Sequence, residues 1–253
     1  MHRPDFSLNG KTAIVTGASR GIGAALATSL AQCDVNVALL GRDTQALDVL
    51  HEALTGDGGS AMQIVADVTD IAALDECFDR VLQKFGRLDI LINNAGIEEV
   101  CSSRTVTEPL WDRILDTNLK SAFFCARAAA NRMTHGGSIV NVCSLTCEVG
   151  VPGAAAYAAS KSGLASLTRT LATEWAADAI RVNGIGPGYF RTALTETFYQ
   201  DDGWQQSMLQ KIPMRRFGRL EDLGGAVVFL CSDAAAYITG QILYVDGGYL
   251  AAV

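Results

Sequence analysis

Residues 12–23 read TAIVTGASRGIG, a short apolar run followed by three closely spaced glycines. The apolar run predicts a buried strand, and the alanine-rich stretch after it predicts a helix that begins near Ile22. Gly17 would allow the tight turn between them, Gly21 would let a pyrophosphate approach the backbone, and Gly23 would let the helix pack closely on the strand. The spacing is G-x-x-x-G-x-G rather than G-x-G-x-x-G, yet it still turns a helix N-terminus toward a bound anion. This stretch therefore predicts a nucleotide-binding strand-turn-helix unit.

Short apolar runs alternate with helical patterns along the rest of the chain. We expect strands at about residues 12–16, 35–40, 62–66, 89–93, 137–143, 180–185 and 242–245. We expect helices that begin near Ile22, Thr44, Ile71, Pro109, Ala155 and Glu221. This alternation is typical of βαβ units on a parallel sheet. With no linker or repeat in between, it predicts a single α/β domain over residues 1–253, a Rossmann-type doubly wound fold whose seven-stranded parallel sheet carries helices on both faces.

The composition excludes several classes of partner. Lys and Arg number 20 and Asp and Glu 27, a formal net charge of −7, so the average field repels nucleic acid and anionic membranes. The longest apolar stretches, at residues 37–40 and 139–142, are far shorter than the roughly 18 residues that cross a bilayer. Pro4, Asp5 and Lys11 stand where a signal peptide would have its apolar run. We therefore expect a cytoplasmic protein with a small-molecule substrate.

The cysteines and histidines do not predict a metal site. Seven cysteines and three histidines are scattered through the chain without a C-x-x-C pair, and no window supplies the clustered ligands that zinc needs. We interpret the cysteines as reduced and mostly buried thiols.

One segment, from Tyr189 to Phe217, departs from the alternation. It is rich in aromatic residues and lacks strand periodicity. Because it follows the sixth expected strand, and ligands of open α/β sheets bind beyond the carboxyl ends of the strands, we predict a substrate lid at about residues 189–217. The alternative is a surface helical hairpin.

The end of the second expected strand indicates which nicotinamide cofactor is bound. NAD-binding folds often place an acid there for the ribose 2′-hydroxyl, whereas an arginine suits a 2′-phosphate. Gly41 takes the place of the acid and Arg42 follows it, while Arg20 lies in the glycine loop. Two guanidinium groups on one phosphate predict a preference for NADP(H) over NAD(H). The alternative is a pair of solvated arginines, with Asp43 partly neutralising Arg42.

Small and polar residues follow the third and fourth expected strands. They are Asp67 with Val68, and Asn94 with Ala95 and Gly96. At the ends of adjacent parallel strands such residues leave room for a flat adenosine, and Asp67 would accept a hydrogen bond from the adenine amino group.

A third group of polar residues indicates a catalytic site. Ser144 follows the fifth expected strand, and Tyr157 and Lys161 lie four residues apart early in the next helix. This spacing puts both side chains on one helix face, where an ammonium favours the phenolate and lowers the pKa of the phenol.

Taken together, TGASRGIG, NNAG, Asn118, Ser144, YAASK and Pro187-Gly188 occur in the order of the classical short-chain dehydrogenases/reductases. The chain resembles this family from about residue 8 to residue 248. The stretches SLTCEVG, RVNGIGPGYFRT and GQILYVDGG look most like the gluconate 5-dehydrogenase branch, which acts on sugar acids and polyols.

The resemblance implies a catalytic tetrad. Tyr157 would be the general acid or base, and Ser144 would orient the substrate oxygen. Lys161 would hold the nicotinamide ribose and lower the pKa of Tyr157, and Asn118 would hold a water molecule that relays protons. Thr192 would bind the carboxamide. The cofactor-binding set implied in full is Thr16, Gly17, Ser19, Arg20, Gly21, Ile22, Gly23, Arg42, Asp67, Val68, Asn94, Ala95, Gly96, Tyr157, Lys161, Pro187, Gly188 and Thr192.

This chain departs from the family pattern at Gly184 and Gly186, where alanine is common. We expect this change to loosen the wall beside Pro187 without removing a reacting group.

The predicted function is NADP(H)-dependent interconversion of a secondary alcohol and a ketone on a small sugar acid or polyol. Alternatives are a 3-oxoacyl-thioester reductase or a general carbonyl reductase. The first would normally favour a basic docking surface for an acidic carrier protein, and the overall acidity of the chain argues against it. A non-catalytic nucleotide-binding protein would be expected to have a broken tetrad. The expected substrate pocket contains Glu98, Thr146, Cys147, Tyr189 and Phe190, and also Glu148 and Pro152.

The family also implies a homotetramer. The expected helix from Pro109 to Met133 carries more apolar residues than one sheet face needs, and the C-terminal segment 249–253 is apolar. Such patches commonly mark contacts between subunits.

Overall fold

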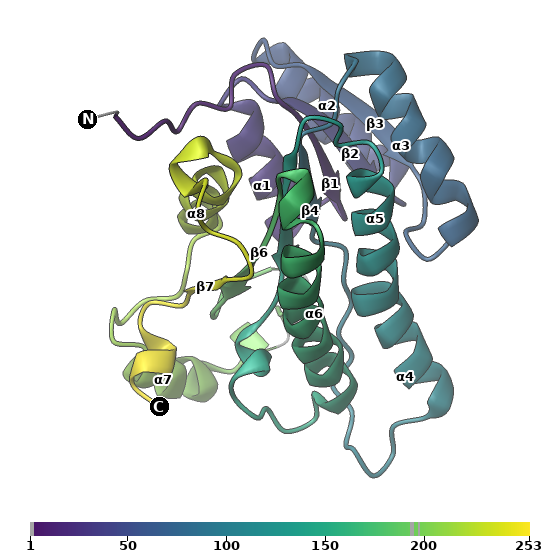
Figure 1. Ribbon diagram of the computed structural model, residues 1–253. Coiled ribbons are helices and arrows are strands. Elements are labelled where there is room, and N and C mark those ends of the chain that lie inside the picture. The colour runs from purple at the N-terminus through teal and green to yellow at the C-terminus, as the bar shows by residue number, and fades with distance from the viewer. Residues whose placement is uncertain (1–2, 193–194, 197) are drawn as a thin grey trace.

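The computed structural model describes residues 3–192, 195–196 and 198–253. Within them, parallel strands form one seven-stranded sheet in the order β3-β2-β1-β4-β5-β6-β7, with helices on both sides (Figure 1). The predicted α/β fold is confirmed. The strands are β1 (Thr12–Thr16), β2 (Asn36–Gly41), β3 (Ala61–Val65), β4 (Ile90–Asn93), β5 (Gly137–Val142), β6 (Ile180–Pro187) and β7 (Ile242–Val245). The α-helices are α1 (Gly21–Ala31), α2 (Thr44–Gly56), α3 (Ile71–Phe85), α4 (Glu108–Leu115), α5 (Ser121–Ala130), α6 (Ala155–Glu174), α7 (Asp202–Lys211) and α8 (Glu221–Cys231).

Two apolar layers, one on each face of the sheet, form the core. Successive side chains of a strand point to opposite faces, so Val15 packs with residues of α1, α2 and α8, whereas Ile14 packs with residues of α3, α5 and α6. Both are fully buried. Burial on both faces explains why the central strands are continuous apolar runs rather than alternating ones.

The strand order reverses between β1 and β4, which places a crevice at the carboxyl ends of these two strands. The glycine loop follows β1, Asn94 follows β4 and Ser144 follows β5. Residues far apart in the sequence therefore meet at one edge of the sheet.

The helix predicted from Pro109 to Met133 is wrong in detail. Thr107 caps its start by accepting a hydrogen bond from the backbone of Leu110, so α4 begins at Glu108. A π-helical turn, η1 (Asp116–Lys120), separates α4 from α5, and α5 ends at Ala130. The apolar periodicity did not reveal the turn. The sixth strand is also longer than predicted, since it runs to Pro187.

The segment predicted to be a lid contains a helix, α7, capped by the Asp201 side chain at 3.0 Å from the Trp204 backbone nitrogen. Within the predicted range, residues 193–194 and 197 lie outside the described part. The lid itself stays a prediction. None of the described helices is long and apolar enough to cross a membrane.

Candidate active site

The glycine loop presents an open helix N-terminus to the crevice. Gly17 and Gly21 have φ angles of 63° and 56°, a region that favours glycine. A Cβ at Gly23 would lie 2.2 Å from the Gly17 carbonyl oxygen, so close packing requires glycine there. Helix α1 starts without a side-chain cap at Arg20 and without an acidic residue in its first turn. Its first backbone N–H groups are therefore available to an anion, and the predicted pyrophosphate site fits this structure.

Thr16 joins this loop to the loop after β4. Its hydroxyl donates to the Ile92 carbonyl at 3.3 Å and accepts from the backbone nitrogens of Asn94 and Ala95, each at 3.0 Å. In return the Asn94 amide donates to the carbonyl oxygens of Thr16 at 2.9 Å and Gly17 at 3.1 Å. These bonds hold the two sides of the crevice together, and they explain why Thr16 and Asn94 are polar in a buried region.

At the predicted adenosine end of the site, Arg42 and Asp67 form an ion pair that the sequence did not predict. Arg42 Nη1 lies 3.2 Å from Asp67 Oδ2, and both side chains are partly exposed. Asp43 caps α2 through the Ala46 nitrogen at 3.1 Å instead of pairing with Arg42. Burial alone would raise the pKa of Asp67, but hydrogen bonds from Thr69 and the Arg42 guanidinium lower it. Val68 is buried in the core beside them.

Gly41 lies next to the glycine loop. A Cβ placed there would be 3.7 Å from the Ser19 Cβ and 3.5 Å from Leu47, which is ordinary contact. Arg42 follows Gly41 and Arg20 follows Ser19, so the two arginines leave the backbone at neighbouring points. The Arg20 side chain is exposed.

Tyr157, Lys161 and Ser144 converge as predicted. Helix α6 places the Lys161 ammonium 5.7 Å from the centre of the Tyr157 ring, and this ammonium donates to the Val142 carbonyl at 2.7 Å. Ser144 follows β5, accepts from the Thr146 nitrogen at 3.2 Å and hydrogen-bonds to the Tyr157 hydroxyl.

The electrostatics of this group differ from the prediction. Burial, and next the charge of Glu98, raise the pKa of Tyr157, and the bond from Ser144 only partly offsets them. Burial also lowers the pKa of Lys161, because desolvation penalises the ammonium. Spacing on one helix face predicted an ammonium that lowers the phenol pKa. In the structure, burial is the largest influence on the pKa of both groups, raising that of Tyr157 and lowering that of Lys161.

Asn118 lies in the π-helical turn η1 and is fully buried. Its Oδ1 accepts from the Ile97 nitrogen at 2.8 Å, and its Nδ2 donates to the Ile97 carbonyl at 2.9 Å and to Ser160 Oγ at 3.1 Å. The π-helical turn thus directs the Asn118 amide toward the site, where the hydrogen bonds of this amide join the loop after β4 to α6. Such turns are frequent at functional sites.

The end of β6 closes the crevice opposite α1. A Cβ at Gly21 would lie 3.7 Å from the Thr192 side chain, so Thr192 faces the start of α1. Pro187 is the last residue of β6. A Cβ at the next residue, Gly188, would lie 2.6 Å from the Asp246 Cα. Thr192 thus lies at the start of α1, and Gly188 lies against Asp246 at the end of β7.

The expected loosening at Gly184 and Gly186 is wrong. A Cβ at Gly186 would lie 2.2 Å from the Tyr244 ring, and one at Gly184 would lie 2.6 Å from Ile242. Side chains of β7 thus fill the space that alanines would occupy. Tyr244 also donates to Glu148 Oε1 at 2.7 Å. The sequence analysis missed Tyr244, and the glycine on the neighbouring strand was the signal that could have revealed it.

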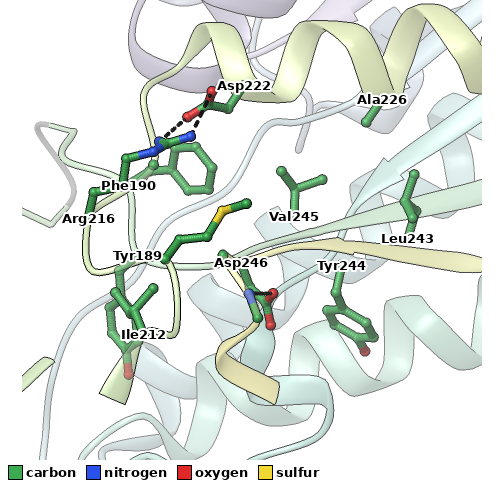
Figure 2. A pocket seen from close by; sticks show the side chains of 14 residues that line it. Tyr189, Phe190, Ile212, Arg216, Asp222, Ala226, Leu243, Tyr244, Val245 and Asp246 are labelled. Atoms are coloured by element: carbon green, nitrogen blue, oxygen red, sulfur yellow. Dashed lines mark hydrogen bonds and ion pairs between the residues drawn. The ribbon is translucent and has the colours of Figure 1, made fainter. Parts of the chain in front are cut away.

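The predicted substrate residues separate into two groups. Tyr189 and Phe190 line a cavity of about 440 Å³ between the start of α8, β7 and the segment after α7 (Figure 2). The cavity lining includes the ion pair of Arg216 with Asp222, but none of the tetrad residues. Tyr189 packs edge-on against Tyr249, with ring centres 5.2 Å apart. This cavity is therefore distinct from the place where Tyr157 and Ser144 meet.

Thr146 and Cys147 instead lie beside Ser144. The Thr146 hydroxyl is buried without a hydrogen-bond partner among the described residues. A hydrogen bond from Cys143 lowers the pKa of Cys147 to about 7, while that bond and burial raise the pKa of Cys143. Pro152 is exposed on the following loop. In the described ranges no three His, Cys, Asp or Glu residues gather as a metal site would require.

Comparison with known proteins supports an oxidoreductase site. The family model described as enoyl-(acyl carrier protein) reductase matches residues 17–250. Gluconate 5-dehydrogenase of Gluconobacter oxydans 621H is 40% identical over 98% of each chain. A solved structure described as a short-chain alcohol dehydrogenase from Sinorhizobium meliloti 1021 is 54% identical, with a TM-score of 0.95 over 98% of this chain and 99% of the other. A gluconate 5-dehydrogenase from Burkholderia cenocepacia J2315 in complex with NADP and tartrate is 34% identical, with a TM-score of 0.95 over 99% of both.

Proposed function

The chain belongs to the short-chain dehydrogenase/reductase family of CH–OH oxidoreductases, and on this premise we propose that it interconverts a secondary alcohol and a ketone on a small sugar acid or polyol with NADP(H). The observation that carries the proposal is the convergence of three features at one sheet edge. These are the uncapped N-terminus of α1, the Ser144–Tyr157 hydrogen bond and the buried Lys161 one helical turn from Tyr157.

Tyr157 exchanges the proton of the reacting hydroxyl. Its raised pKa keeps the phenol protonated, which suits donation to the developing alkoxide during reduction. Ser144 would hold the substrate oxygen beside the Tyr157 hydroxyl, since the Ser144 hydroxyl acts on the pKa of that phenol by hydrogen bonding. In the oxidative direction the Lys161 ammonium would favour the phenolate.

The nicotinamide supplies or accepts the hydride when the cofactor is bound. Lys161 would hold the nicotinamide ribose with the N–H groups that Val142 does not occupy. Thr192 would bind the carboxamide from across the crevice. The Asn118 Oδ1 already accepts a hydrogen bond from Ile97, and its Nδ2 donates to Ile97 and Ser160. A relay water would therefore bind the remaining lone pair of Oδ1.

NADP(H) is the proposed preferred cofactor. Support comes from Gly41 in the place of an acid, from Arg42 and Arg20 beside it, and from the NADP held by the Burkholderia gluconate 5-dehydrogenase. Arg42 would leave Asp67 to contact the 2′-phosphate, and Asp67 would then turn to the adenine amino group.

The second candidate function, reduction of a 3-oxoacyl thioester, is favoured by the family model's description as an acyl-carrier-protein reductase. A panel of polyols, sugar acids and 3-oxoacyl thioesters, assayed with each nicotinamide cofactor, separates the two. We expect turnover of the hydroxylated compounds. Turnover of thioesters alone would favour the second function, and no turnover with either cofactor would contradict the proposal.

We further propose a homotetramer in which α4, α5 and the C-terminal residues meet partner subunits. Trp111 on α4 is 41% exposed, and Val253 is 67% exposed. A monodisperse monomer in light scattering at micromolar concentration would contradict this assembly.

A further inference from the structure

Glu98 is a carboxyl group in the active site that none of the proposed catalytic steps uses. It lies in the loop after β4, and its side chain is about half-buried. The loop is fixed on both sides of it. Before it, Ile97 makes two hydrogen bonds to Asn118, and after it the Cys101 nitrogen donates to the Gly153 carbonyl at 2.9 Å. The backbone on both sides of Glu98 is therefore fixed by hydrogen bonds.

The position of this loop brings Glu98 close to the reacting groups. A Cβ at Gly96, two residues earlier, would lie 3.5 Å from the Lys161 ammonium and 3.4 Å from Asn118 Oδ1. The charge of Glu98 raises the pKa of both Tyr157 and Lys161. The carboxyl group thus faces the catalytic helix α6 at electrostatic range.

Glu98 differs from the other glutamates around the site in having no partner. Glu99 pairs with Arg113, and Glu148 accepts from Tyr244. No described residue donates a hydrogen bond to the Glu98 carboxyl or forms an ion pair with it, and Lys161 is the one described cation whose charge stabilises its ionised form. A partly buried carboxylate without donors is costly. A ligand that supplies donors would relieve that cost.

Three arginines of the segments that follow β4 and β6 are engaged in ion pairs. Arg113 is paired with Glu99, Arg191 with Glu196 and Arg216 with Asp222. None of these three is free to neutralise a carboxylate of the substrate, and Glu98 would repel one.

We propose that Glu98 is a specificity-determining residue that accepts hydrogen bonds from substrate hydroxyl groups and disfavours a substrate carboxylate, so that the chain prefers a neutral or cationic polyol to a sugar acid. This inference rests on the proposed function and narrows it. The preferred substrate is a polyhydroxylated alcohol or the corresponding ketone, and an ammonium group near Glu98 is accepted as well as a hydroxyl.

The test uses three compounds that differ only at carbon 1: D-gluconate, D-glucitol and D-glucamine, which end in a carboxylate, a hydroxymethyl and an aminomethyl group. They are assayed with NADP near pH 8, several units above the ordinary pKa of a glutamate, about 4.3. For the wild type we expect kcat/KM for glucitol to exceed that for gluconate by at least about tenfold, or about 1.4 kcal/mol, mostly through KM. Glucamine should match or exceed glucitol.

The variant Glu98→Gln keeps the size of the side chain and removes its charge. It should bring the ratio of glucitol to gluconate to within about threefold of one and weaken glucamine most, since the ammonium loses its counter-charge. The matched control is Glu99→Gln, which removes the adjacent charge outside the site and should leave the ratio unchanged. An equal melting temperature for both variants verifies that they fold.

Binding separates this inference from the proposed function. Dissociation constants of the three compounds for the complex with NADPH, read from nicotinamide fluorescence, give their order without turnover. Absence of turnover with the expected order of binding contradicts the proposed function alone. Gluconate binding as tightly as glucitol, a ratio unaffected by Glu98→Gln, or no binding of any of the three overturns the role of Glu98.

Discussion

Replacing Gly41 by Asp and Arg42 by Ile is expected to reverse the cofactor preference from NADP(H) to NAD(H). The first change restores an acid for the ribose 2′-hydroxyl, and the second removes a proposed partner of the 2′-phosphate. The backbone accepts the new side chain, because a Cβ at residue 41 meets Leu47 and Ser19 at 3.5–3.7 Å. The reacting end of the nicotinamide is untouched, so the rate constant with NAD(H) should change little.

The size of the preference follows from the exposure of Arg42 and its present partner. A hydrogen bond between charged groups contributes roughly 1.5–3 kcal/mol. The Arg42 side chain is 67% exposed, which reduces this to about 1–1.5 kcal/mol. Leaving Asp67 costs about 0–1 kcal/mol, the usual value of an exposed ion pair. Arg20 adds a second contact of similar size. The two contacts less this cost leave about 1–3 kcal/mol, so we expect the wild type to favour NADP(H) by roughly 5- to 150-fold.

The assay is kcat/KM for both cofactors at one substrate concentration and fixed ionic strength, for the wild type and the double variant. Arg80→Ala serves as the control, since it removes an exposed arginine of α3 away from the crevice. Equal or better wild-type efficiency with NAD(H) would refute the reasoning. It would mean that Arg42 stays with Asp67 when the cofactor binds, while the proposed alcohol chemistry would be unaffected.

Three further outcomes are expected. Tyr157→Phe should lower kcat by a factor of about 10² to 10⁴ with little change in the Kd of NADPH, because it removes one transferable proton; a residual rate above about a tenth of the wild type would contradict the assignment. Gly23→Ala should cost about 1–3 kcal/mol of unfolding free energy, because its Cβ would lie 2.2 Å from a backbone carbonyl oxygen. Gly225→Ala on α8, with open space around the new methyl group, should instead be neutral or stabilising. Alkylation of Cys147, followed by mass spectrometry, should rise with pH to half its maximum near pH 7, since its pKa is lowered to about 7 and the thiolate is the reactive form; a midpoint near 9 would show that the thiol is not activated.

Several features of the fold and site could be predicted because they depend on short stretches of sequence. The glycine loop, for example, requires Gly17 and Gly21 to adopt positive φ values, and glycine is the residue that does so at little cost. The position of Lys161 relative to Tyr157 follows from helical spacing alone. Strand ends were less predictable: β6 runs two residues past the expected end because its pairing with β7 continues to Pro187.

The sequence by itself determined the succession of strands and helices and the glycine loop, because each depends on periodicity or turn chemistry within a short window, while the resemblance to a family implied the catalytic tetrad. Only the tertiary structure decided how distant side chains share their bonds. Arg42 pairs with Asp67 rather than with its neighbour Asp43, and Tyr244 fills the space beside Gly186. Likewise, Glu98 is left without a partner while Glu99 obtains one. These outcomes depend on how loops from different strands pack at one edge, and on the desolvation that packing imposes, neither of which is encoded in any local pattern.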